Sequence, residues 1–323
     1  MFTYKFDTQK RRNSIIKKNN GETYCAIGFP KAGNTADTRF FGQGKEKILV
    51  VKRPKYYDKF GPFNEDKIKR IDQIFESAYR REQEIWNLVY PDNKAELFTD
   101  AGVRLVLPYF PGVALKESLS EDEYKLDPLS LCQKLLAVAY AVQNFYNLGF
   151  KCSDFHLDNV LIERKSNDLF HAYLIDFDPV NSINYIGGYK ELDAINQLVP
   201  GVQWNTYYKT IDTLINGLIE KIDTLKIKRS QEEKLTKLFN ALPETDKNDL
   251  IRKFIEFINP NQSIWDRGKR ARYTKLHEQE GLENFLIREQ FCLFLKSESP
   301  LIHEQLSQNG LEDEELLISK RVF

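Results

Sequence analysis

The sequence predicts an α+β protein with a β-rich front, one long helix, a Pro-Gly joint and a helical body. Short runs of β-branched and aromatic residues fill the first third of the 323-residue chain. A helical apolar pattern follows over 65–89, and helical patterns dominate after Trp204. No internal repeat and no low-complexity linker interrupts this order. A chain of this length can bury the core of one large domain or of two modest lobes.

Composition narrows the classes of partner and site. Lys plus Arg and Asp plus Glu both number 47, so no net charge selects nucleic acid or a membrane, and we expect no nucleic-acid partner. The cysteines and histidines lack metal-binding spacing, which argues against zinc and indicates free thiols in a reducing compartment. With no apolar run of about 18 residues and no signal-peptide core, we expect a soluble protein without a transmembrane segment.

Strands are expected at 23–28 (TYCAIG), 38–43 (TRFFGQ) and 47–52 (KILVVK), because these runs are β-type and are bounded by turn residues. Gly44 centres the turn between the last two. A further strand is expected at 103–107 (VRLVL), which the segment PYFPG ends. The first hundred residues are therefore expected to form a β-rich front.

The helix expected at 65–89 carries an unusual carboxylate. Apolar residues at three- and four-residue steps define its inward face: Ile71, Ile74, Phe75, Ala78, Ile85, Trp86 and Val89. Glu82 fills the gap on that face. Because a carboxylate among apolar side chains needs a partner, we expect a cation opposite Glu82.

The helical body begins with an apolar helix at 129–148, for which Gly149 is the C-terminal signal. Two short strands follow, at 160–163 and 172–175. Further helices are expected at 207–222, 231–242, 247–258, 282–296 and 300–306.

Two acidic clusters lie beside the two short strands. KCSDFHLDNVLIE at 151–163 places Asp154 and Asn159 five residues apart, and LIDFD at 174–178 contains Asp176. Carboxylates beside apolar strands cost desolvation energy unless a positive charge lies between them. Asn159 and Asp176 offer the oxygen ligands that Mg²⁺ takes together with phosphates. Asp154 is then free to orient or deprotonate an acceptor hydroxyl.

This D-x-x-x-x-N … I-D-F pattern resembles the protein-kinase superfamily. The resemblance implies a bilobal protein-kinase-like fold with an N-lobe at 1–107, a C-lobe at 108–245 and a helical extension with an acidic tail at 246–323. It also implies ATP and Mg²⁺ or Mn²⁺ as cofactors. The implied catalytic base is Asp154, and the implied metal ligands are Asn159, Asp176 and, as an added third carboxylate, Asp178.

Further kinase landmarks follow in the expected order between Tyr24 and Leu225. Lys52, at a strand end, resembles the lysine that holds the α- and β-phosphates, which makes it the implied cation for Glu82. LVLPYFPG resembles a strand-to-hinge segment, with Leu107 as the gatekeeper and Tyr109 and Phe110 against the adenine. TIDTLINGL supplies the aspartate and glycine of a helix that braces the catalytic loop, Asp212 and Gly217.

Several positions depart from the protein-kinase pattern. GFPKAGNT offers only Gly28 and Gly33 to cover the phosphates, so the alternative is an ordinary hairpin turn. Asn34 stands where a Walker A loop requires lysine, which excludes a P-loop NTPase. Cys152 and Ser153 replace the usual His-Arg, so activation by loop phosphorylation is not expected. His156 is similar to the histidine of kinase-like small-molecule phosphotransferases.

A basic cluster, DRGKRARYTK, predicts a polyanion site for an inositol phosphate, a phosphoinositide or an acidic partner; the alternative is a solvated helical face. Its cations are Arg267, Lys269, Arg270, Arg272 and Lys275. The basic residues between Lys10 and Lys18 are expected to form a mobile tail.

The C-terminal segment NGLEDEELLISKRVF resembles the glutamate-rich tail of bacterial type IV secretion substrates, as in Legionella effectors. An acidic helix start has the same pattern and is the alternative. The resemblance implies secretion by a bacterium into a host cell and action in the host cytoplasm; otherwise the protein is cytoplasmic.

These observations favour an atypical kinase that transfers the γ-phosphate of ATP to a Ser/Thr hydroxyl of a host protein. One alternative keeps the fold and changes the reaction, to a small-molecule phosphotransferase or an AMP transferase. The other is a pseudokinase scaffold that binds nucleotide or polyanion. The retention of Lys52, Asp154, Asn159 and Asp176 in order argues against the scaffold.

Overall fold

The computed structural model describes 2–5, 15–18, 21–32, 36–58, 61–99, 102–119, 127–151, 155–166, 169–177, 190–199, 208–258 and 291–298. The chain divides into two compact units, Met1–Ser118 with Gln133–Leu218, and Leu119–Cys132 with Ile219–Phe323. The lobe boundaries expected from the sequence stay predictions. Within the described part of the chain, no helix is long and apolar enough to cross a membrane.

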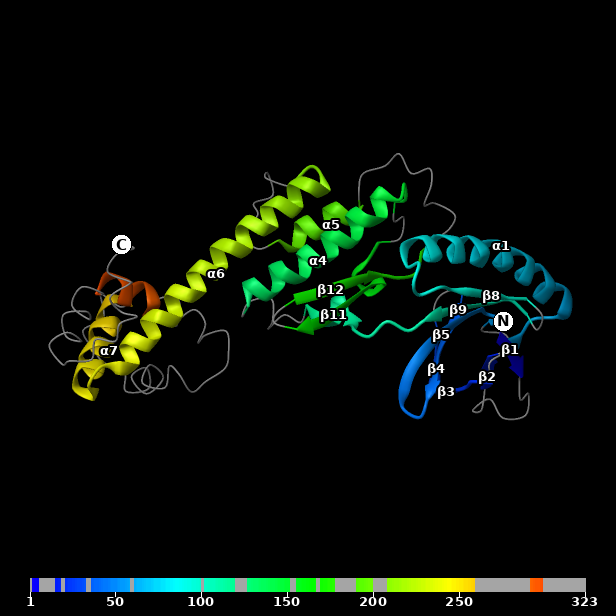
Figure 1. The fold of residues 1–323 in the computed structure, drawn as a ribbon, viewed down its shortest axis with the longest axis horizontal. Helices are drawn as coiled ribbons and strands as arrows, with labels where there is room; N and C mark the ends of the chain where they lie inside the picture. Colours follow the sequence, from blue (N-terminus) through cyan, green and yellow to red (C-terminus); the bar gives the residue numbers. More distant parts are fainter. Residues whose placement is uncertain are drawn as a thin grey trace. The chain divides into compact units, whose positions relative to one another are not determined.

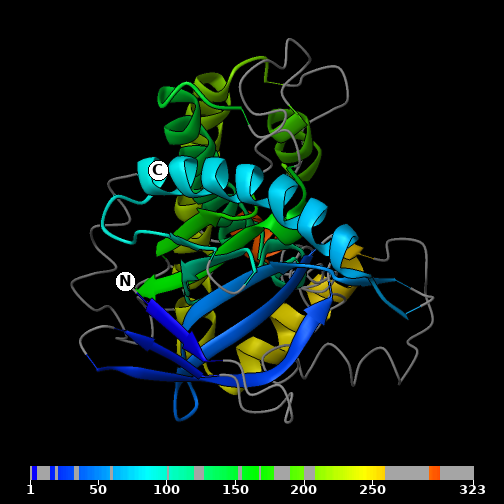
Figure 2. The ribbon, with the colours of Figure 1, turned by 90° about the vertical axis from the view of Figure 1, so that its right-hand side faces the viewer.

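A curled, seven-stranded antiparallel sheet forms the front of the first unit (Figures 1 and 2). The strands lie in the order β1-β2-β3-β4-β5-β9-β8. A separate two-stranded ribbon joins β6 and β7. The bounds are β1 Phe2–Lys5, β2 Ile15–Lys18, β3 Thr23–Ala32, β4 Ala36–Gln43, β5 Glu46–Pro54, β6 Tyr57–Asp58, β7 Gly61–Pro62, β8 Glu96–Phe98 and β9 Arg104–Pro108.

The two faces of this sheet have different roles. One face buries an apolar cluster made by Ile16, Tyr24, Phe41, Leu49, Val51 and Val106. Because successive strand residues point to opposite faces, Val50 and Lys52 lie on the other face of β5. Their cross-strand partners in β9 are Leu107 and Leu105. The sheet register therefore directs the ammonium of Lys52 away from the apolar cluster.

The long helix α1 runs from Glu65 to Val89, as predicted, and lies alongside β8 and β9 (Figures 1 and 2). Asn64 caps the helix, because its side chain accepts a hydrogen bond from the Lys67 amide at 2.9 Å. The negative charges of Glu65 and Asp66 in the first turn interact favourably with the positive end of the helix dipole.

The inward face of α1 differs from the predicted one at Ile74 and Tyr79. Tyr79, Glu82, Ile85 and Trp86 are buried, whereas Ile74 is 67% exposed, so its placement on the inward face was wrong. Ile74 lies five residues before Tyr79, which puts it about 140° round the helix from that side chain. The buried face follows contacts with the sheet that apolar periodicity alone does not specify.

The rest of the first unit is mainly helical. A three-stranded sheet orders β10 Val113–Ala114, β11 Val160–Ser166 and β12 Leu169–Leu174. The helices are α2 Leu115–Ser118, α4 Pro128–Asn147, the 3₁₀ turn Leu157–Asn159, α5 Lys190–Leu198 and the start of α6. Gly149 adopts φ 83 just beyond α4, as its C-terminal signal predicts. The predicted α+β class, with a β-rich front and a helical remainder, is confirmed.

Three element predictions were wrong. The helices expected at 207–222 and 231–242 form one continuous helix, α6 Ile211–Ala241, because neither Pro nor Gly interrupts 218–241. Ile15–Lys18, expected in a mobile tail, forms β2 and pairs with β3. Strand β8 has no counterpart in the prediction. The helix expected at 282–296 is described from residue 291 only, over 291–297, and 300–306 lies outside the described residues.

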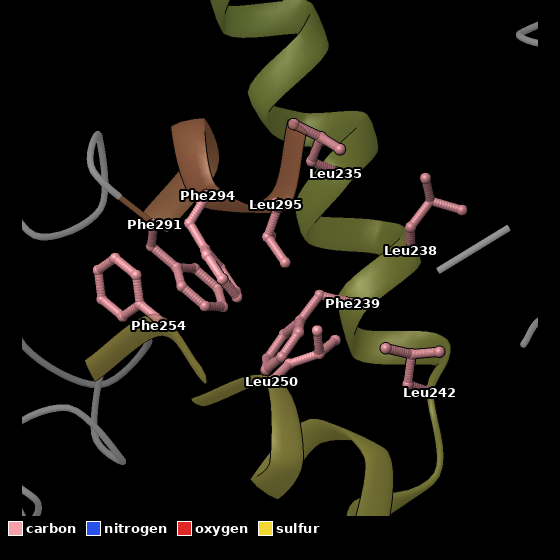
Figure 3. Packing of buried hydrophobic residues seen from close by; sticks show 9 residues of the cluster. All are labelled: Leu235, Leu238, Phe239, Leu242, Leu250, Phe254, Phe291, Phe294 and Leu295. Atoms are coloured by element: carbon pink, nitrogen blue, oxygen red, sulfur yellow. The ribbon is translucent and has the colours of Figure 1, made fainter. Parts of the chain in front are cut away.

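The second unit has an apolar core of its own (Figure 3). It joins the C-terminal half of α6, helix α7 Glu244–Ile258 and residues 291–297. Phe254 is fully buried, and its ring lies edge-on to Phe291 at 5.0 Å between centroids. The cluster consists of Leu235, Leu238, Phe239, Leu242, Leu250, Phe254, Phe291, Phe294 and Leu295.

We expect Phe254→Ala to lower the free energy of unfolding of the second unit by about 3–5 kcal/mol, because it leaves a cavity beside Phe291 and Phe294 in this cluster. Urea denaturation of the full chain measures the change. Leu293→Ala is the matched control, since Leu293 lies on 291–297 but is 56% exposed; it should cost no more than about 0.5 kcal/mol. Equal losses for the two variants would contradict this description of the core.

Candidate active site

Lys52 is the centre of a three-residue ion network. Its Nζ atom lies 2.6 Å from Oε1 of Glu82 and 2.5 Å from Oδ1 of Asp176. The three residues come from β5, from α1 and from the segment after β12. The pairing of Lys52 with Glu82 is the one that the sequence predicts, and it supplies the cation that the buried carboxylate requires.

The electrostatics of this network favour the charged form of Lys52. Burial by itself lowers the pKa of the Lys52 amine, but the charges and hydrogen bonds of Glu82 and Asp176 outweigh that effect. The pKa of Lys52 is therefore raised. The glutamate side chain is only 5% exposed, whereas the aspartate is 57% exposed. One carboxylate thus fixes the cation, and the other remains accessible to solvent or ligand.

The backbone of Asp176 is held in an uncommon conformation. Its φ of 62 is in the left-handed region, which aspartate tolerates better than most side chains but which still costs energy. Both neighbours are anchored. The amide of Ile175 donates to the carbonyl of Asn159 at 2.9 Å, and Phe177 is 2% exposed. These anchors and the ion pair with Lys52 hold the carboxylate in place.

Asn159 lies next to Asp176 because of strand pairing. Val160 pairs with Leu174 in β11 and β12, so the residues that flank this pair meet at the same end of the two strands. Asn159 is 8% exposed and ends the 3₁₀ turn Leu157–Asn159. The structure thus brings together two of the predicted metal ligands from positions 17 residues apart in the sequence.

The donor set at this point fits Mg²⁺ or Mn²⁺. An amide oxygen and a carboxylate are hard ligands, and Mg²⁺ commonly takes few protein ligands while water and phosphate complete its shell. Among the described residues, no group of three or more His, Cys, Asp or Glu side chains could hold a metal ion. Asn159 and Asp176 offer one amide and one carboxylate group, so water and the phosphates of a ligand would complete the shell of a metal ion bound there.

An aromatic cluster packs around Phe177, the residue that follows Asp176 of the ion network. Phe177 stacks on Phe145 of α4 at 5.1 Å, and Trp86 of α1 lies 5.9 Å from Phe177. Tyr90, at the end of α1, donates its hydroxyl to the carbonyl of Leu174 at 2.9 Å. Helix α1 and the end of β12 are therefore packed and hydrogen-bonded together. The rings of the cluster are Trp86, Tyr90, Phe110, Phe145, Phe150, Tyr173 and Phe177.

An apolar surface lies beside Lys52 on the same face of the front sheet. Phe40 pairs with Val50, which pairs with Leu107, so their side chains form a row across three strands. The Tyr109 ring lies edge-on to Phe40 at 5.9 Å, and the ammonium of Lys47 lies 4.5 Å from the centre of the Phe40 ring. A flat apolar row next to a cation suits a ligand with a planar base and a phosphate chain.

The predicted hinge residues Tyr109 and Phe110 have different surroundings. The Tyr109 amide donates to the carbonyl of Ile48 at 2.8 Å, which extends the pairing of β5 and β9 beyond Pro108. Phe110 is 6% exposed and stacks between Trp86 and Tyr173, at 5.3 and 4.2 Å. Its side chain belongs to the aromatic cluster. The adenine contacts of both residues, and the gatekeeper role of Leu107, stay predictions.

Gly28 lies inside β3 with φ 69. The pairing with β4 is irregular between Ile27 and Lys31, which identifies a bulge that favours glycine. Three other predicted site residues, Gly33, Asp154 and Asp178, lie outside the described residues. So does the basic cluster, which consists of Arg267, Lys269, Arg270, Arg272 and Lys275. Their roles stay predictions.

A second charged group lies on the 3₁₀ turn that ends at Asn159. Lys116 of α2 lies 3.2 Å from Oδ2 of Asp158, and Nδ1 of His156 lies 3.8 Å from the same oxygen. All three side chains are exposed.

The predicted brace, Asp212, accepts a hydrogen bond from the Gln143 side chain at 2.5 Å, and a Cβ on Gly217 would lie 2.2 Å from the hydroxyl oxygen of Tyr208.

The prediction missed two groups of residues near the network. Tyr79 precedes Glu82 by three residues on the inward face of α1 and is 4% exposed. The aromatic cluster residues Tyr90 and Tyr173 were also missed. An i−3 spacing from the buried glutamate could have indicated Tyr79, but no local signal distinguishes Tyr173 from any other aromatic strand residue.

The chain was compared with known proteins. No protein-family model and no curated protein matches it. Among solved structures it is similar to the autoinhibited serine kinase domain of the giant muscle protein titin, with a TM-score of 0.33 and 14% identity. The match covers 48% of this chain and 44% of that chain, so the protein spans less than half of that domain. The chemistry of the site follows from its own geometry.

We expect Lys52→Met to lower the free energy of unfolding by about 3 kcal/mol at pH 7, because it leaves the Glu82 carboxylate buried without its cation. The raised pKa of Lys52 means that its stabilisation is complete below about pH 10.4, the ordinary lysine pKa. It is lost as pH rises through the folded-state pKa. The difference between wild type and variant should therefore shrink in alkali, which urea titrations from pH 7 to high pH can measure.

Lys116→Met is the matched control, since Lys116 forms an exposed pair with Asp158. Exposed pairs contribute little, so its stability should stay close to that of the wild type at every pH. If Lys52→Met behaved like this control, the network would not contribute to the stability of the first unit.

Proposed function

We propose that the protein is an atypical kinase that transfers the γ-phosphate of ATP to a hydroxyl group. The observation that carries the proposal is the bridging of Lys52 between a buried glutamate and a half-exposed aspartate, at 2.6 and 2.5 Å. A fixed cation beside an accessible carboxylate suits the binding of a phosphate chain with its divalent metal. The apolar row from Phe40 to Leu107 offers a surface for the base on the same side of the sheet.

Each residue has a defined task in this mechanism. Lys52 binds the α- and β-phosphates, and Glu82 holds its ammonium in position. Asn159 and Asp176 would hold Mg²⁺ or Mn²⁺, which neutralises the phosphate charge when bound. The acceptor oxygen attacks the γ-phosphorus while the bond from that phosphorus to the β–γ bridging oxygen breaks, and ADP leaves. Asp154, the base predicted from the sequence pattern, orients the acceptor hydroxyl and receives its proton.

The acceptor that we propose first is a Ser/Thr hydroxyl of a host protein, with the chain acting as a translocated bacterial effector. The likeness of its acidic C-terminal segment to secretion tails supports this role. The basic cluster around Arg270 is proposed to bind an inositol phosphate or phosphoinositide, on the basis of its charge.

A small-molecule acceptor is the second candidate, and one observation favours it. His156 and Lys116 place two cationic or ionisable groups around Asp158, within four residues of the predicted base Asp154 in the sequence. Such a group suits an acceptor that carries its own negative charge. This candidate uses the same phosphate site and differs only in what accepts the phosphoryl group.

We expect the purified protein, incubated with γ-labelled ATP and Mg²⁺ or Mn²⁺, to transfer label to itself or to a component of host-cell extract. Asp176→Ala and Asp154→Asn should each abolish the transfer, because they remove a metal ligand and the acceptor-orienting carboxylate. Asp223→Ala is the control, since Asp223 is exposed on α6 far along the sequence from the site, and it should transfer label at the wild-type rate.

Two results would contradict the proposal. Labelling that persists in Asp176→Ala would assign the activity to a contaminant. If the protein binds nucleotide but transfers no label from γ-labelled ATP, α-labelled ATP tests whether it transfers AMP instead. If no label is transferred from α-labelled ATP either, the protein is a scaffold that binds nucleotide.

A further inference from the structure

Tyr79 presents a buried hydroxyl close to the ion network. Its side chain is 4% exposed, and its hydroxyl is among the few buried polar atoms of the described residues that lack a hydrogen-bond partner. The ring itself is held, since it lies edge-on to Phe75 at 5.3 Å between centroids. A buried hydroxyl without a partner is uncommon and costs desolvation energy, so its presence calls for a physical reason.

The surroundings of this hydroxyl are anionic. Burial raises the pKa of the Tyr79 phenol, and the negative charges of Glu82 and Asp176 raise it further. The phenol therefore stays protonated and remains a hydrogen-bond donor over the whole physiological range. Its two strongest carboxylate neighbours belong to the Lys52 network.

Helix geometry places Tyr79 next to Glu82. Residues three apart are neighbours on a helix surface. Tyr79 and Glu82 therefore share the inward face of α1, where both are buried. Oε1 of Glu82 accepts a hydrogen bond from the ammonium of Lys52 at 2.6 Å.

We propose that Tyr79 is a positioning residue, whose hydroxyl donates a hydrogen bond to the Glu82 carboxylate when a nucleotide occupies the site. This inference rests on the function proposed above. A phosphate chain brings several negative charges to Lys52 and draws the ammonium toward itself. Glu82, which is almost fully buried, then has a weaker hold on its cation. A phenol donor at its side offsets that loss, because hydrogen bonds to ionised groups are the strong ones.

A test follows from removing the hydroxyl alone. Tyr79→Phe deletes an atom that has no partner in the ligand-free structure, so the melting temperature without ligand should stay unchanged or rise. The affinity for ATP with Mg²⁺ should fall by about tenfold, the equivalent of one charge-assisted hydrogen bond. Isothermal titration calorimetry of the full chain gives the dissociation constants, and thermal unfolding with and without ATP gives the matching shifts.

Tyr56→Phe is the matched control with the opposite expectation. The Tyr56 hydroxyl already donates to Oδ1 of Asp72, so its removal should lower the melting temperature without ligand and leave ATP affinity unchanged. Full wild-type affinity in Tyr79→Phe would overturn the inference and leave the proposed function standing. A fall in ligand-free melting temperature like that of Tyr56→Phe would assign Tyr79 a structural role. If the wild type binds no ATP, the proposed function and the inference fail together.

Discussion

The ammonium of Lys52 connects three parts of the chain that are far apart in sequence. Strand β5 supplies the cation, α1 supplies Glu82 from 30 residues away, and the segment after β12 supplies Asp176 from 124 residues away. A buried carboxylate without a cation is costly, and so is a buried amine without an anion. The register of β5, the rotation of α1 and the exit of β12 must therefore all be compatible with one contact. Lys52 therefore fixes the arrangement of these three segments, in addition to the phosphate-binding role that we propose for it.

The site is held in place before any ligand binds. Asp176 adopts its left-handed conformation because Ile175 is hydrogen-bonded to Asn159 and Phe177 is packed among aromatic rings. Catalysis by positioning depends on such rigidity, since the cost of ordering the groups is met during folding. Among the described residues, the Tyr79 hydroxyl is one of the few buried polar atoms without a hydrogen-bond partner. We propose that it donates to Glu82 when a ligand draws Lys52 away.

Much of the fold and part of the site could be predicted from the sequence because they depend on local patterns. Alternating β-type runs located β3, β4, β5 and β9, and the approximate range expected for α1 agrees with its observed bounds. A carboxylate on an apolar helical face required a cation, and the resemblance to the kinase pattern implied that Lys52 is that cation. A resemblance in motif order then identified Asn159 and Asp176, which the structure places at the ends of paired strands.

Contacts between distant segments decided the features of the fold that local sequence patterns do not specify. The sequence placed Glu82, Ile85 and Trp86 on the buried face of α1, as observed. It did not show that Ile74 is exposed and Tyr79 buried, because contacts with the sheet decide the limits of that face. It also missed β2, whose four residues become a strand only by pairing with β3. Spacing thus determined α1 and the strands β3, β4, β5 and β9, and it located the charged residues of the site. Tertiary packing decided the partners of those residues, since burial and desolvation are set by neighbours from elsewhere in the chain.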